Sequence, residues 1–266
     1  MLRRKMNAAK PFVRFDNVGY APRGAADAVI SEFNLEIFRG ETLVLLGESG
    51  CGKTTTLKLV NRMLSPTSGE VRVADKPTGE WDAIRLRRST GYVIQEAGLF
   101  PHFNVARNVA LVPTLEGWPA ARVRERVREM LTLVGLDPET YGERFPRELS
   151  GGQRQRVGVA RALAADPPLL LMDEPFGALD PLTRTSLQNE FARLRTRLNK
   201  TVIFVTHDVR EALRLATRIA LMRAGKIILL ATPDEFMRTE EPLARAYLET
   251  LRLDETPTPP AARQAD

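Results

Sequence analysis

Cysteine is almost missing from this sequence, because the 266 residues contain only one, Cys51. A single cysteine excludes a disulfide within the chain, which fits a protein of a reducing compartment. Histidine is nearly as rare, with His102 and His207 as its two examples. A disulfide-bonded scaffold is therefore excluded.

Long apolar runs are also missing. The longest runs are the size of β-strands, at Leu169–Met172, Val202–Val205 and Ile227–Ala231, whereas a membrane helix needs about 18 apolar residues. The basic stretch MLRRKMNAAKPF at the start has no apolar segment behind it, so it does not have the form of a secretory signal. If this protein works at a membrane, we expect it there as a peripheral subunit.

A dense basic segment is the third absence. The formal net charge is +6, a balance that can favour nucleic acid or an anionic membrane surface. The Lys and Arg residues are scattered along the chain, however, and scattered charge is typical of a solvated surface. We therefore expect no nucleic-acid partner.

What the sequence does contain is an alternation of strand and helix patterns. Phe12–Val18 and Ala28–Ile37 alternate in part and predict strands, as does the apolar run that ends at Leu46. After Ser150 the pattern predicts helices alternating with three more strands, at Leu169–Met172, Val202–Val205 and Ile219–Met222. Strands that alternate with helices pair in parallel, so we predict an α/β sheet.

The middle of the chain, from about Phe100 to Phe145, is predicted to be mostly helical. Val123, Val127 and Leu131 recur at helical spacing with Arg and Glu between them, which indicates a core stripe and a charged solvated face. The end of the chain, ETPTPPAARQAD, is rich in proline and has no apolar periodicity. We predict a disordered tail there.

One glycine-rich stretch follows the run that ends at Leu46. The pattern G-x-x-x-x-G-K-[ST] of a phosphate-binding P-loop is filled by Gly47, Glu48, Ser49, Gly50, Cys51, Gly52, Lys53 and Thr54. Glycines let successive N–H groups turn toward an anion, and the following helix adds the positive end of its dipole. Lys53 is predicted to reach the β- and γ-phosphates, and the Thr54 hydroxyl to bind Mg²⁺. Glu48 and Cys51 are assigned no catalytic role.

Acidic residues at a neighbouring strand end complete the predicted site. Asp173 directly follows the run Leu169–Met172, where a carboxylate would hold Mg²⁺ through water. Glu174 comes next and is placed to polarise a water against the γ-phosphate, which indicates hydrolysis rather than transfer. His207 follows the strand Val202–Val205, at the end of the sheet where α/β ligand sites lie.

A second glycine-rich turn opens another predicted helix. It consists of Ser150, Gly151, Gly152 and Gln153. By the same dipole argument it is a second phosphate cap; alternatively, Ser150 is only a helix N-cap and the glycines serve the turn. Because the chain has only one P-loop, a second phosphate cap raises the question of which bound phosphate it would contact.

Together these stretches resemble the nucleotide-binding subunit of ABC transporters. GESGCGKT resembles the Walker A motif, LLLMDE resembles Walker B, LSGGQ the family signature, GALDP the D-loop and VTHD the segment of the switch histidine. Gln95 matches the glutamine of the Q-loop. The resemblance runs from about residue 12 to residue 248.

The resemblance implies a fold and a division of the chain. We expect an α/β fold of the P-loop NTPase type, in which a RecA-like core carries an antiparallel β subdomain and an inserted α-helical subdomain. The ATPase domain would span 12–248, with the helical subdomain at about 96–165. Residues 1–11 would form an N-terminal extension, and 249–266 a tail.

The resemblance also implies an activity. Two copies would pack head to tail, so that LSGGQ of one covers the ATP held by Walker A of the other. Glu174 would polarise the attacking water, and His207 would contact the γ-phosphate. Gln95 would join Thr54 and Asp173 at Mg²⁺ and link the site to the membrane partner.

The adenine contact is a departure from the family pattern. In the family, an aromatic residue a few positions after the first strand stacks on adenine. Here Pro22 stands at that position, and Tyr20 lies two residues earlier. Tyr20 is kept as the candidate, with the alternative that it is an ordinary strand residue.

The residues around the motifs resemble a narrower group within the superfamily. TTTLKLVNRMLSPTSG and GYVIQEAGLFPHFNVARNVALVP look like the ATPases of bacterial importers for quaternary amines such as glycine betaine and choline. This likeness implies ATP and Mg²⁺ as cofactors, transmembrane permease subunits as partners, an indirect link to a solute-binding protein, and a peripheral place on the cytoplasmic face of the inner membrane. The alternatives are another importer, an exporter, or an ABC ATPase of DNA repair or translation.

Overall fold

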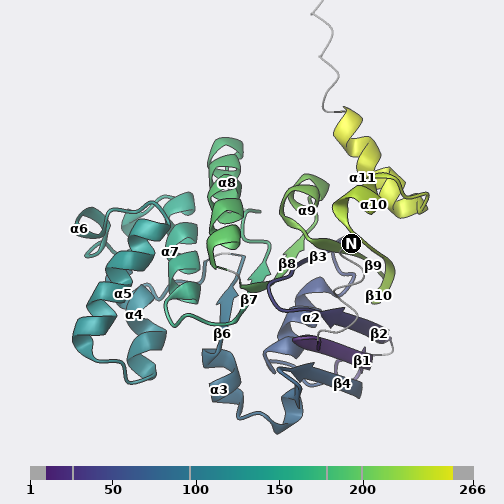
Figure 1. Cartoon of the computed structure of the whole chain (residues 1–266), viewed down its shortest axis with the longest axis horizontal. Helices are drawn as coiled ribbons and strands as arrows, with labels where there is room; N and C mark the ends of the chain where they lie inside the picture. Colours follow the sequence, from purple (N-terminus) through teal and green to yellow (C-terminus); the bar gives the residue numbers. More distant parts are fainter. Residues whose placement is uncertain (1–9, 26, 96, 178, 199, 254–266) are drawn as a thin grey trace, which may run out of the picture.

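Two β-sheets organise the chain (Figure 1). The computed structural model describes residues 10–25, 27–95, 97–177, 179–198 and 200–253. The smaller sheet is antiparallel, in the order β2-β1-β4-β5, and comprises β1 (Val13–Tyr20), β2 (Ile30–Ile37), β4 (Ser68–Val73) and β5 (Lys76–Pro77). Most of the predicted extension, residues 1–9, lies outside the described residues.

The larger sheet has the order β10-β9-β3-β8-β7-β6. Its strands are β3 (Thr42–Gly47), β6 (Thr90–Val93), β7 (Leu169–Asp173), β8 (Thr201–Thr206), β9 (Arg218–Arg223) and β10 (Lys226–Ala231). All neighbours pair in parallel except β10 with β9. The parallel pairing expected from the alternating pattern is therefore present.

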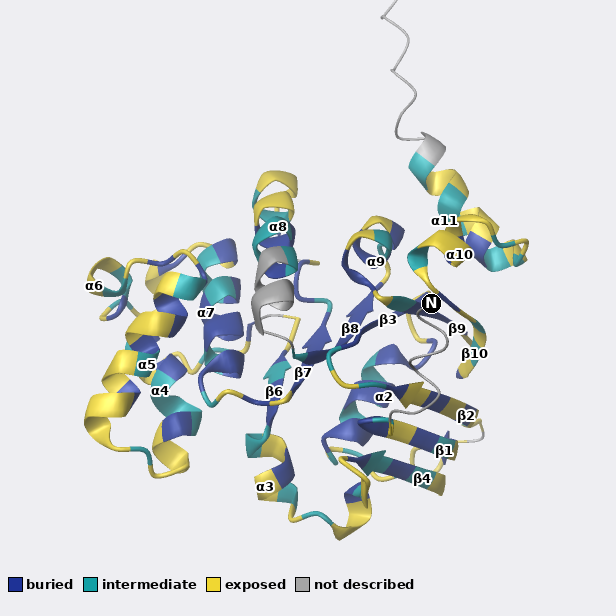
Figure 2. Cartoon of the chain, in the orientation of Figure 1, coloured by how far each residue is buried: buried dark blue, intermediate teal, exposed yellow. Residues whose placement is uncertain are grey.

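The central strands are buried on both faces. Every residue of β3, β7 and β8 is buried, and Figure 2 shows these strands in dark blue. Successive residues of β3 enter different cores: Leu43 and Leu45 belong to one cluster, Val44 and Leu46 to the other. Continuous apolar runs of this kind are typical of parallel strands covered on both sides.

The helices lie around these sheets. They are α2 (Lys53–Val60), α3 (Ala83–Arg88), α4 (Val105–Leu115), α5 (Ala120–Leu133), α6 (Pro138–Tyr141), α7 (Gly151–Leu163), α8 (Pro181–Leu198), α9 (Val209–Leu215), α10 (Pro233–Met237) and α11 (Pro242–Leu253), with short 3₁₀ turns at Thr78–Glu80 and Pro146–Glu148. Figure 1 places α4 to α7 together, beyond the β6 edge of the larger sheet.

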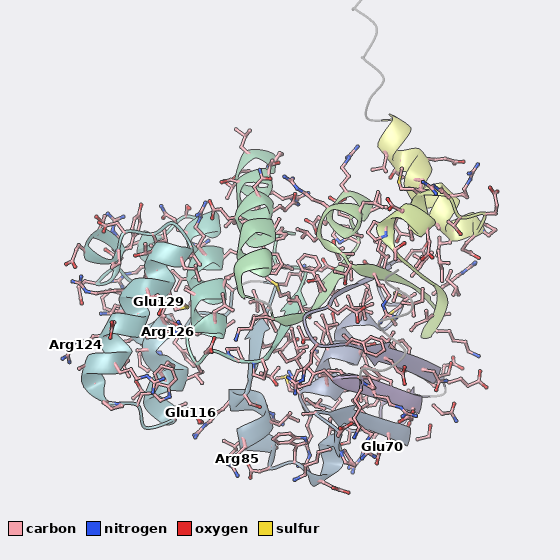
Figure 3. All side chains as sticks on the ribbon, in the orientation of Figure 1. Glu70, Arg85, Glu116, Arg124, Arg126 and Glu129 are labelled. Atoms are coloured by element: carbon pink, nitrogen blue, oxygen red, sulfur yellow. The ribbon has the colours of Figure 1, made fainter. Side chains whose placement is uncertain are left out.

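A charged side chain attaches helix α5 to the end of α7. Its buried residues include Val123, Val127 and Leu131, as the periodicity predicts. Arg126 is largely buried and donates to the carbonyl of Ala164 at 2.9 Å, which ties α5 to the end of α7. Arg124, two positions earlier, is exposed, and Figure 3 shows both side chains on the same helix.

The end of the chain differs from the expectation. Helix α11 continues to Leu253, so its last residues, 249–253, are helical where the sequence analysis places the start of a tail. Residues 254–266 lie outside the described part of the chain. Among the described residues, no helix combines the length and apolar character that a membrane crossing needs.

Candidate functional site

The glycine-rich loop joins the end of β3 to the start of α2 (Figure 1). Gly50 and Gly52 have φ angles of 82° and 102°, in the region that favours glycine. A Cβ on Gly52 would lie 2.5 Å from the Cδ1 of Ile30. The glycine pattern is therefore required by both backbone conformation and close packing.

Lys53 is buried, with 5% of its surface exposed. Its Nζ donates to the carbonyl oxygen of Gly47 at 2.7 Å and to that of Glu48 at 2.8 Å. The ammonium group is thus held inside the loop by two carbonyls. A ligand with several negative charges would offer it stronger acceptors than these neutral groups.

A cavity of about 340 Å³ opens at this loop. It is lined by Val29, Ser49, Gly50, Gly52, Lys53, Thr54, Thr55 and Glu174. The backbone N–H groups of the first turn of α2 have no helical acceptor of their own and carry the positive end of the helix dipole. An anion is therefore the ligand that this cavity suits best.

Cys51 has a structural place in the loop. It is buried, with 6% exposed, and belongs to the core cluster beneath the loop. Burial raises the pKa of its thiol, which disfavours a thiolate. The Glu48 side chain is exposed, and its carbonyl oxygen accepts from the N–H of Cys51 at 3.3 Å. Both residues therefore contribute to loop geometry.

Thr54 and Asp173 meet beside the cavity. The Thr54 hydroxyl donates to Oδ1 of Asp173 at 2.8 Å. Burial, and then the charge of Glu174, raise the pKa of Asp173 above its ordinary value. Two hard oxygen donors this close suit Mg²⁺, which binds proteins through one or two carboxylates and keeps several waters.

Tyr92 is a member of this site that the sequence analysis did not identify. Its hydroxyl lies 3.4 Å from Oδ2 of Asp173. Burial, and then the negative charge of Asp173, raise the pKa of the Tyr92 phenol. The phenol therefore remains a hydrogen-bond donor that holds the carboxylate in place. Its position on β6, beside β7, places it there.

Glu174 stands at the centre of the site. Its φ angle is 43°, a left-handed conformation that is uncommon for a residue other than glycine. Its N–H donates to the carbonyl of Val205 at 3.1 Å, which anchors the turn to β8. Its Oε2 lies 3.2 Å from Nδ1 of His207 and 3.4 Å from Nε2 of Gln95. Three residues singled out in the sequence therefore meet at one oxygen atom.

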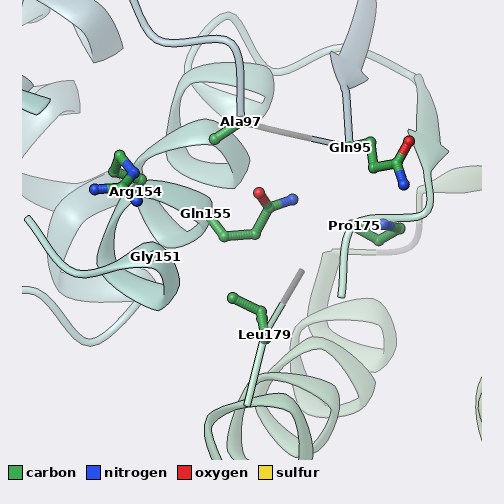
Figure 4. Close-up of a pocket in the computed structure, with 7 residues that line it drawn as sticks. All are labelled: Gln95, Ala97, Gly151, Arg154, Gln155, Pro175 and Leu179. Atoms are coloured by element: carbon green, nitrogen blue, oxygen red, sulfur yellow. The ribbon is translucent and has the colours of Figure 1, made fainter. Parts of the chain in front are cut away.

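A second cavity of about 310 Å³ lies on the other side of Gln95. It is lined by Gln95, Ala97, Gly151, Arg154, Gln155, Pro175 and Leu179 (Figure 4). Figure 4 shows the side chain of Gln155 extending into this space. Gln155 is 4% exposed, and its Nε2 has no hydrogen-bond partner in the part of the chain that the structure describes.

The second glycine-rich turn lies at the start of α7 and consists of Ser150, Gly151, Gly152 and Gln153; we call it the signature turn. The Ser150 hydroxyl accepts from the N–H of Gln153 at 3.2 Å, and the Gln153 side chain accepts from the N–H of Ser150 at 2.9 Å. This is a capping box, so the N-cap alternative describes the chain as it stands. Gly151 lines the second cavity and Lys53 the first. The two glycine-rich turns therefore face different cavities within one chain.

Tyr20 ends β1, next to the phosphate cavity. Its carbonyl accepts from the N–H of Val29 at 2.8 Å, and Val29 lines that cavity. The Tyr20 side chain is partly buried against the core beneath the loop. The adenine contact stays a prediction.

Arg161 and Gly158, two residues of α7 that the sequence analysis missed, hold Ala97 and Gly98 in place. Arg161 in α7 donates to the carbonyls of Ala97 at 2.7 Å and Gly98 at 2.8 Å. A Cβ on Gly158, also in α7, would lie 3.3 Å from the Cβ of Ala97. The segment is therefore fastened to the helix that begins at the signature turn.

Asn108 in α4 fastens the next part of the same segment. It is fully buried, accepts from the N–H of Phe100 at 2.8 Å, and donates to the carbonyls of Phe100, Phe103 and Asn104 at 3.0 to 3.1 Å. The Asn108 side chain thereby satisfies backbone groups of a loop that lacks the regular pairing of a helix or strand. The sequence gives only a weak signal for Arg161 and Asn108, because a polar residue within a helix is usually exposed.

The chain is similar to a known protein family and to known proteins over most of its length. The chain matches the family model described as "ABC transporter" over residues 30–177. It is 52% identical over 226 residues to the glycine betaine/carnitine/choline transport ATP-binding protein OpuCA of Bacillus subtilis, an alignment that covers 85% of the chain and 59% of the relative. The glycine betaine uptake system ATP-binding protein YehX of Escherichia coli is 50% identical over 208 residues, or 78% of the chain and 67% of the relative. The chain thus spans about three fifths of the length of OpuCA.

Solved structures agree with these relatives. The dimeric post-hydrolysis structure of the ATP-binding cassette MJ0796, bound to ADP and Pi, has a TM-score of 0.75 and 32% identity, and the match covers 83% of this chain and 98% of that one. The structure of cbiO1 from Clostridium perfringens, part of the complex cbiONQ, has a TM-score of 0.78 and 27% identity over 92% and 97% of the two chains. The predicted fold class is confirmed.

Proposed function

Because the chain belongs to the ABC transporter family, we propose that it is the ATP-hydrolysing subunit of an importer that drives a small solute of the quaternary-amine osmoprotectant class through a separate permease. The observation that carries the ATPase part is the meeting of Gln95, Glu174 and His207 beside the cavity at the glycine-rich loop, which Glu174 lines. The solute class is supported by the names of OpuCA and YehX.

ATP would bind with its phosphates in the cavity at the glycine-rich loop. Lys53 would exchange its two carbonyl acceptors for the β- and γ-phosphates. Thr54 and Asp173 would hold Mg²⁺, with Gln95 as the third predicted contact. When bound, the ion neutralises charge that develops on the phosphates. Tyr20 remains the candidate for the adenine ring.

Hydrolysis would depend on Glu174. Its carboxylate lines the phosphate cavity, so it can accept a hydrogen bond from a water placed against the γ-phosphate. His207 has 58% of its side chain exposed, which leaves the imidazole free to contact a phosphate oxygen while it stays next to Glu174. Both residues would act by positioning and charge stabilisation.

A second copy of the chain would complete the site. Gly151 of the signature turn lines a cavity separate from the one at the glycine-rich loop of its own chain. In a head-to-tail dimer, the signature turn of one copy would cap the ATP of the other. The dimeric MJ0796 structures support this arrangement.

The permease contact would lie at the segment from Leu99 to Asn108. Phe100 is 40% exposed at this segment, although Asn108 holds its backbone firmly. A rigid loop with an exposed aromatic residue suits docking to a partner. The subunit would then sit peripherally at the cytoplasmic face of the inner membrane, and meet a solute-binding protein only through the permease.

Uptake measurements test the importer proposal. The chain would be expressed together with the permease and the solute-binding protein of its transporter in a bacterium that lacks osmoprotectant uptake. We expect accumulation of labelled glycine betaine or choline that requires Lys53, with Lys53→Met as the inactive control. Export of the same solutes, or accumulation of neither, would contradict the proposal.

Docking is tested separately by co-purification. Phe100→Ser should lower the recovery of the permease with the chain. Met63→Ser, at an apolar residue outside the segment that is 54% exposed, is the matched control. Undiminished recovery with Phe100→Ser would place the contact elsewhere.

A further inference from the structure

Three buried polar side chains behind His207 have no part in the proposed chemistry. Thr206, Glu211 and Gln188 are 2%, 4% and 7% exposed. The Thr206 hydroxyl donates to Oε2 of Glu211 at 2.6 Å, and Nε2 of Gln188 donates to Oε1 of Glu211 at 2.9 Å. A buried carboxylate is costly unless its oxygens are hydrogen-bonded, and both oxygens of Glu211 are.

The network reaches the backbone on both sides of His207. Because the single proton of the Thr206 hydroxyl goes to Glu211, the oxygen lone pairs remain free to accept the N–H of Asp208, at 2.9 Å. The Asp208 side chain in turn accepts from the N–H of Arg210 at 2.8 Å and caps α9. His207 is thus carried on a turn whose two flanking residues are held by this chain of hydrogen bonds.

The network also reaches the loop before α8. Gln188 lies on α8 one turn after Arg184, so the two side chains share a helix face. The Arg184 guanidinium lies 3.4 Å from the carbonyl of Gly177, 3.3 Å from that of Leu179 and 4.0 Å from a carboxylate oxygen of Asp208. Gly177, Leu179 and the turn of His207 are therefore joined to the same face of one helix.

We propose that Glu211 is a positioning residue for His207. By fixing the Thr206 hydroxyl, Glu211 sets the direction of the turn that aims the imidazole at Glu174. Through Gln188 it ties that direction to α8, whose Arg184 contacts Gly177 and Leu179. The inference rests on the proposed role of His207 in ATP hydrolysis. A displacement of about 1 Å at a catalytic group can cost about 100-fold in rate, so a remote hydrogen bond can control turnover.

The test is a double-mutant cycle on the full 266-residue chain. Thr206→Val keeps the shape of the side chain and removes the hydroxyl, whereas Thr206→Ser keeps the hydroxyl. We expect Thr206→Val to lower kcat at least tenfold with little change in the KM for Mg-ATP, and Thr206→Ser to stay within about threefold of the parent chain. In the His207→Ala background, Thr206→Val should add less than a twofold loss.

The outcomes separate the inference from the function beneath it. If His207→Ala alone leaves kcat unchanged, the proposed role of His207 is wrong, and the inference fails with it. If His207→Ala is slow and Thr206→Val lowers kcat by the same factor in both backgrounds, only the inference is overturned. If Thr206→Val does not fold, Glu211→Gln, which keeps side-chain volume, is carried through the same cycle and judged by the same criterion.

Discussion

The Oε2 atom of Glu174 lies 3.2 Å from Nδ1 of His207, although the two residues are 33 positions apart in the chain. The contact joins the ends of β7 and β8, neighbouring strands of the larger sheet. The carboxylate of Glu174, a residue that lines the cavity at the glycine-rich loop, therefore has a hydrogen-bonding partner at the end of the neighbouring strand.

The first prediction concerns that carboxylate. Glu174→Gln should bind Mg-ATP with nearly unchanged affinity but lower kcat by about 100-fold or more, the usual loss on removing a general base. The variant should also accumulate as an ATP-bound dimer. Single-turnover hydrolysis and size-exclusion chromatography with light scattering measure both. Glu48→Gln, at an exposed residue of the loop, is the control, and near-parental turnover in Glu174→Gln would refute the assignment.

The second prediction concerns the ammonium group in the loop. Lys53→Met should weaken Mg-ATP binding by about 10- to 100-fold, because a hydrogen bond to a charged group is worth roughly 1.5–3 kcal/mol. Equilibrium titration with a fluorescent ATP analogue gives the Kd. Lys10→Met, at a side chain that is 83% exposed, should bind like the parent chain. Equal affinity in the two variants would rule out a phosphate role for Lys53.

The third prediction is a pH dependence of stability. Burial raises the pKa of Glu211 above its ordinary value, although hydrogen bonds from Thr206 and Gln188 and the charge of Arg184 oppose the shift, and Asp208 adds to it. A carboxyl with a raised pKa in the folded chain contributes stability at low pH that is lost as the pH rises through that pKa. Relative to the parent chain, Glu211→Gln should therefore gain free energy of unfolding as the pH rises above the ordinary pKa of a glutamate, about 4.3.

Urea denaturation across this pH range checks the sign. Glu125→Gln, at an exposed glutamate of α5, serves as the reference for surface carboxylates. A stability difference between Glu211→Gln and the parent chain that shrinks as the pH rises would contradict the argument.

The fourth prediction concerns the second cavity. Replacing Gln155 by methionine keeps the length of the side chain and removes a buried donor without a partner among the described residues. Gln155→Met should raise the free energy of unfolding by about 1 kcal/mol and the melting temperature by about 2–4 °C. The matched control is Gln188→Met, which removes a donor bonded to Glu211 and should lower both. Equal shifts in the two variants would refute the distinction.

Local pattern was sufficient for the parts of the fold that the sequence predicts well. The strands β3, β7 and β8 are continuous apolar runs because a parallel sheet buries both faces, and the glycine pattern after Leu46 demands a tight turn. Strand β6 escaped prediction because Thr90–Val93 contains Gly91 and a polar residue and forms no apolar run.

The contacts around the site needed the folded chain. Tyr92 reaches Asp173 only because β6 pairs with β7, 81 residues later. The bond between Gln188 and Glu211 likewise joins two helices across β8. Neither pair has a local spacing that predicts it, since side-chain partners across elements are set by the register of strands and the packing of helices.

The fastening of Ala97 and Gly98 to Arg161 makes α7 a lever. Arg161 lies near one end of this arm, where it binds Ala97 and Gly98, and Ser150 lies at the other end. Ser150 is about 16 Å from Arg161 along the helix axis, so a turn of about 10° at the fastened end moves Ser150 by about 3 Å. That displacement equals the length of one hydrogen bond. In the proposed head-to-tail dimer, a rotation of this size caused by a partner at Phe100 would make or break the contact between the signature turn and a phosphate.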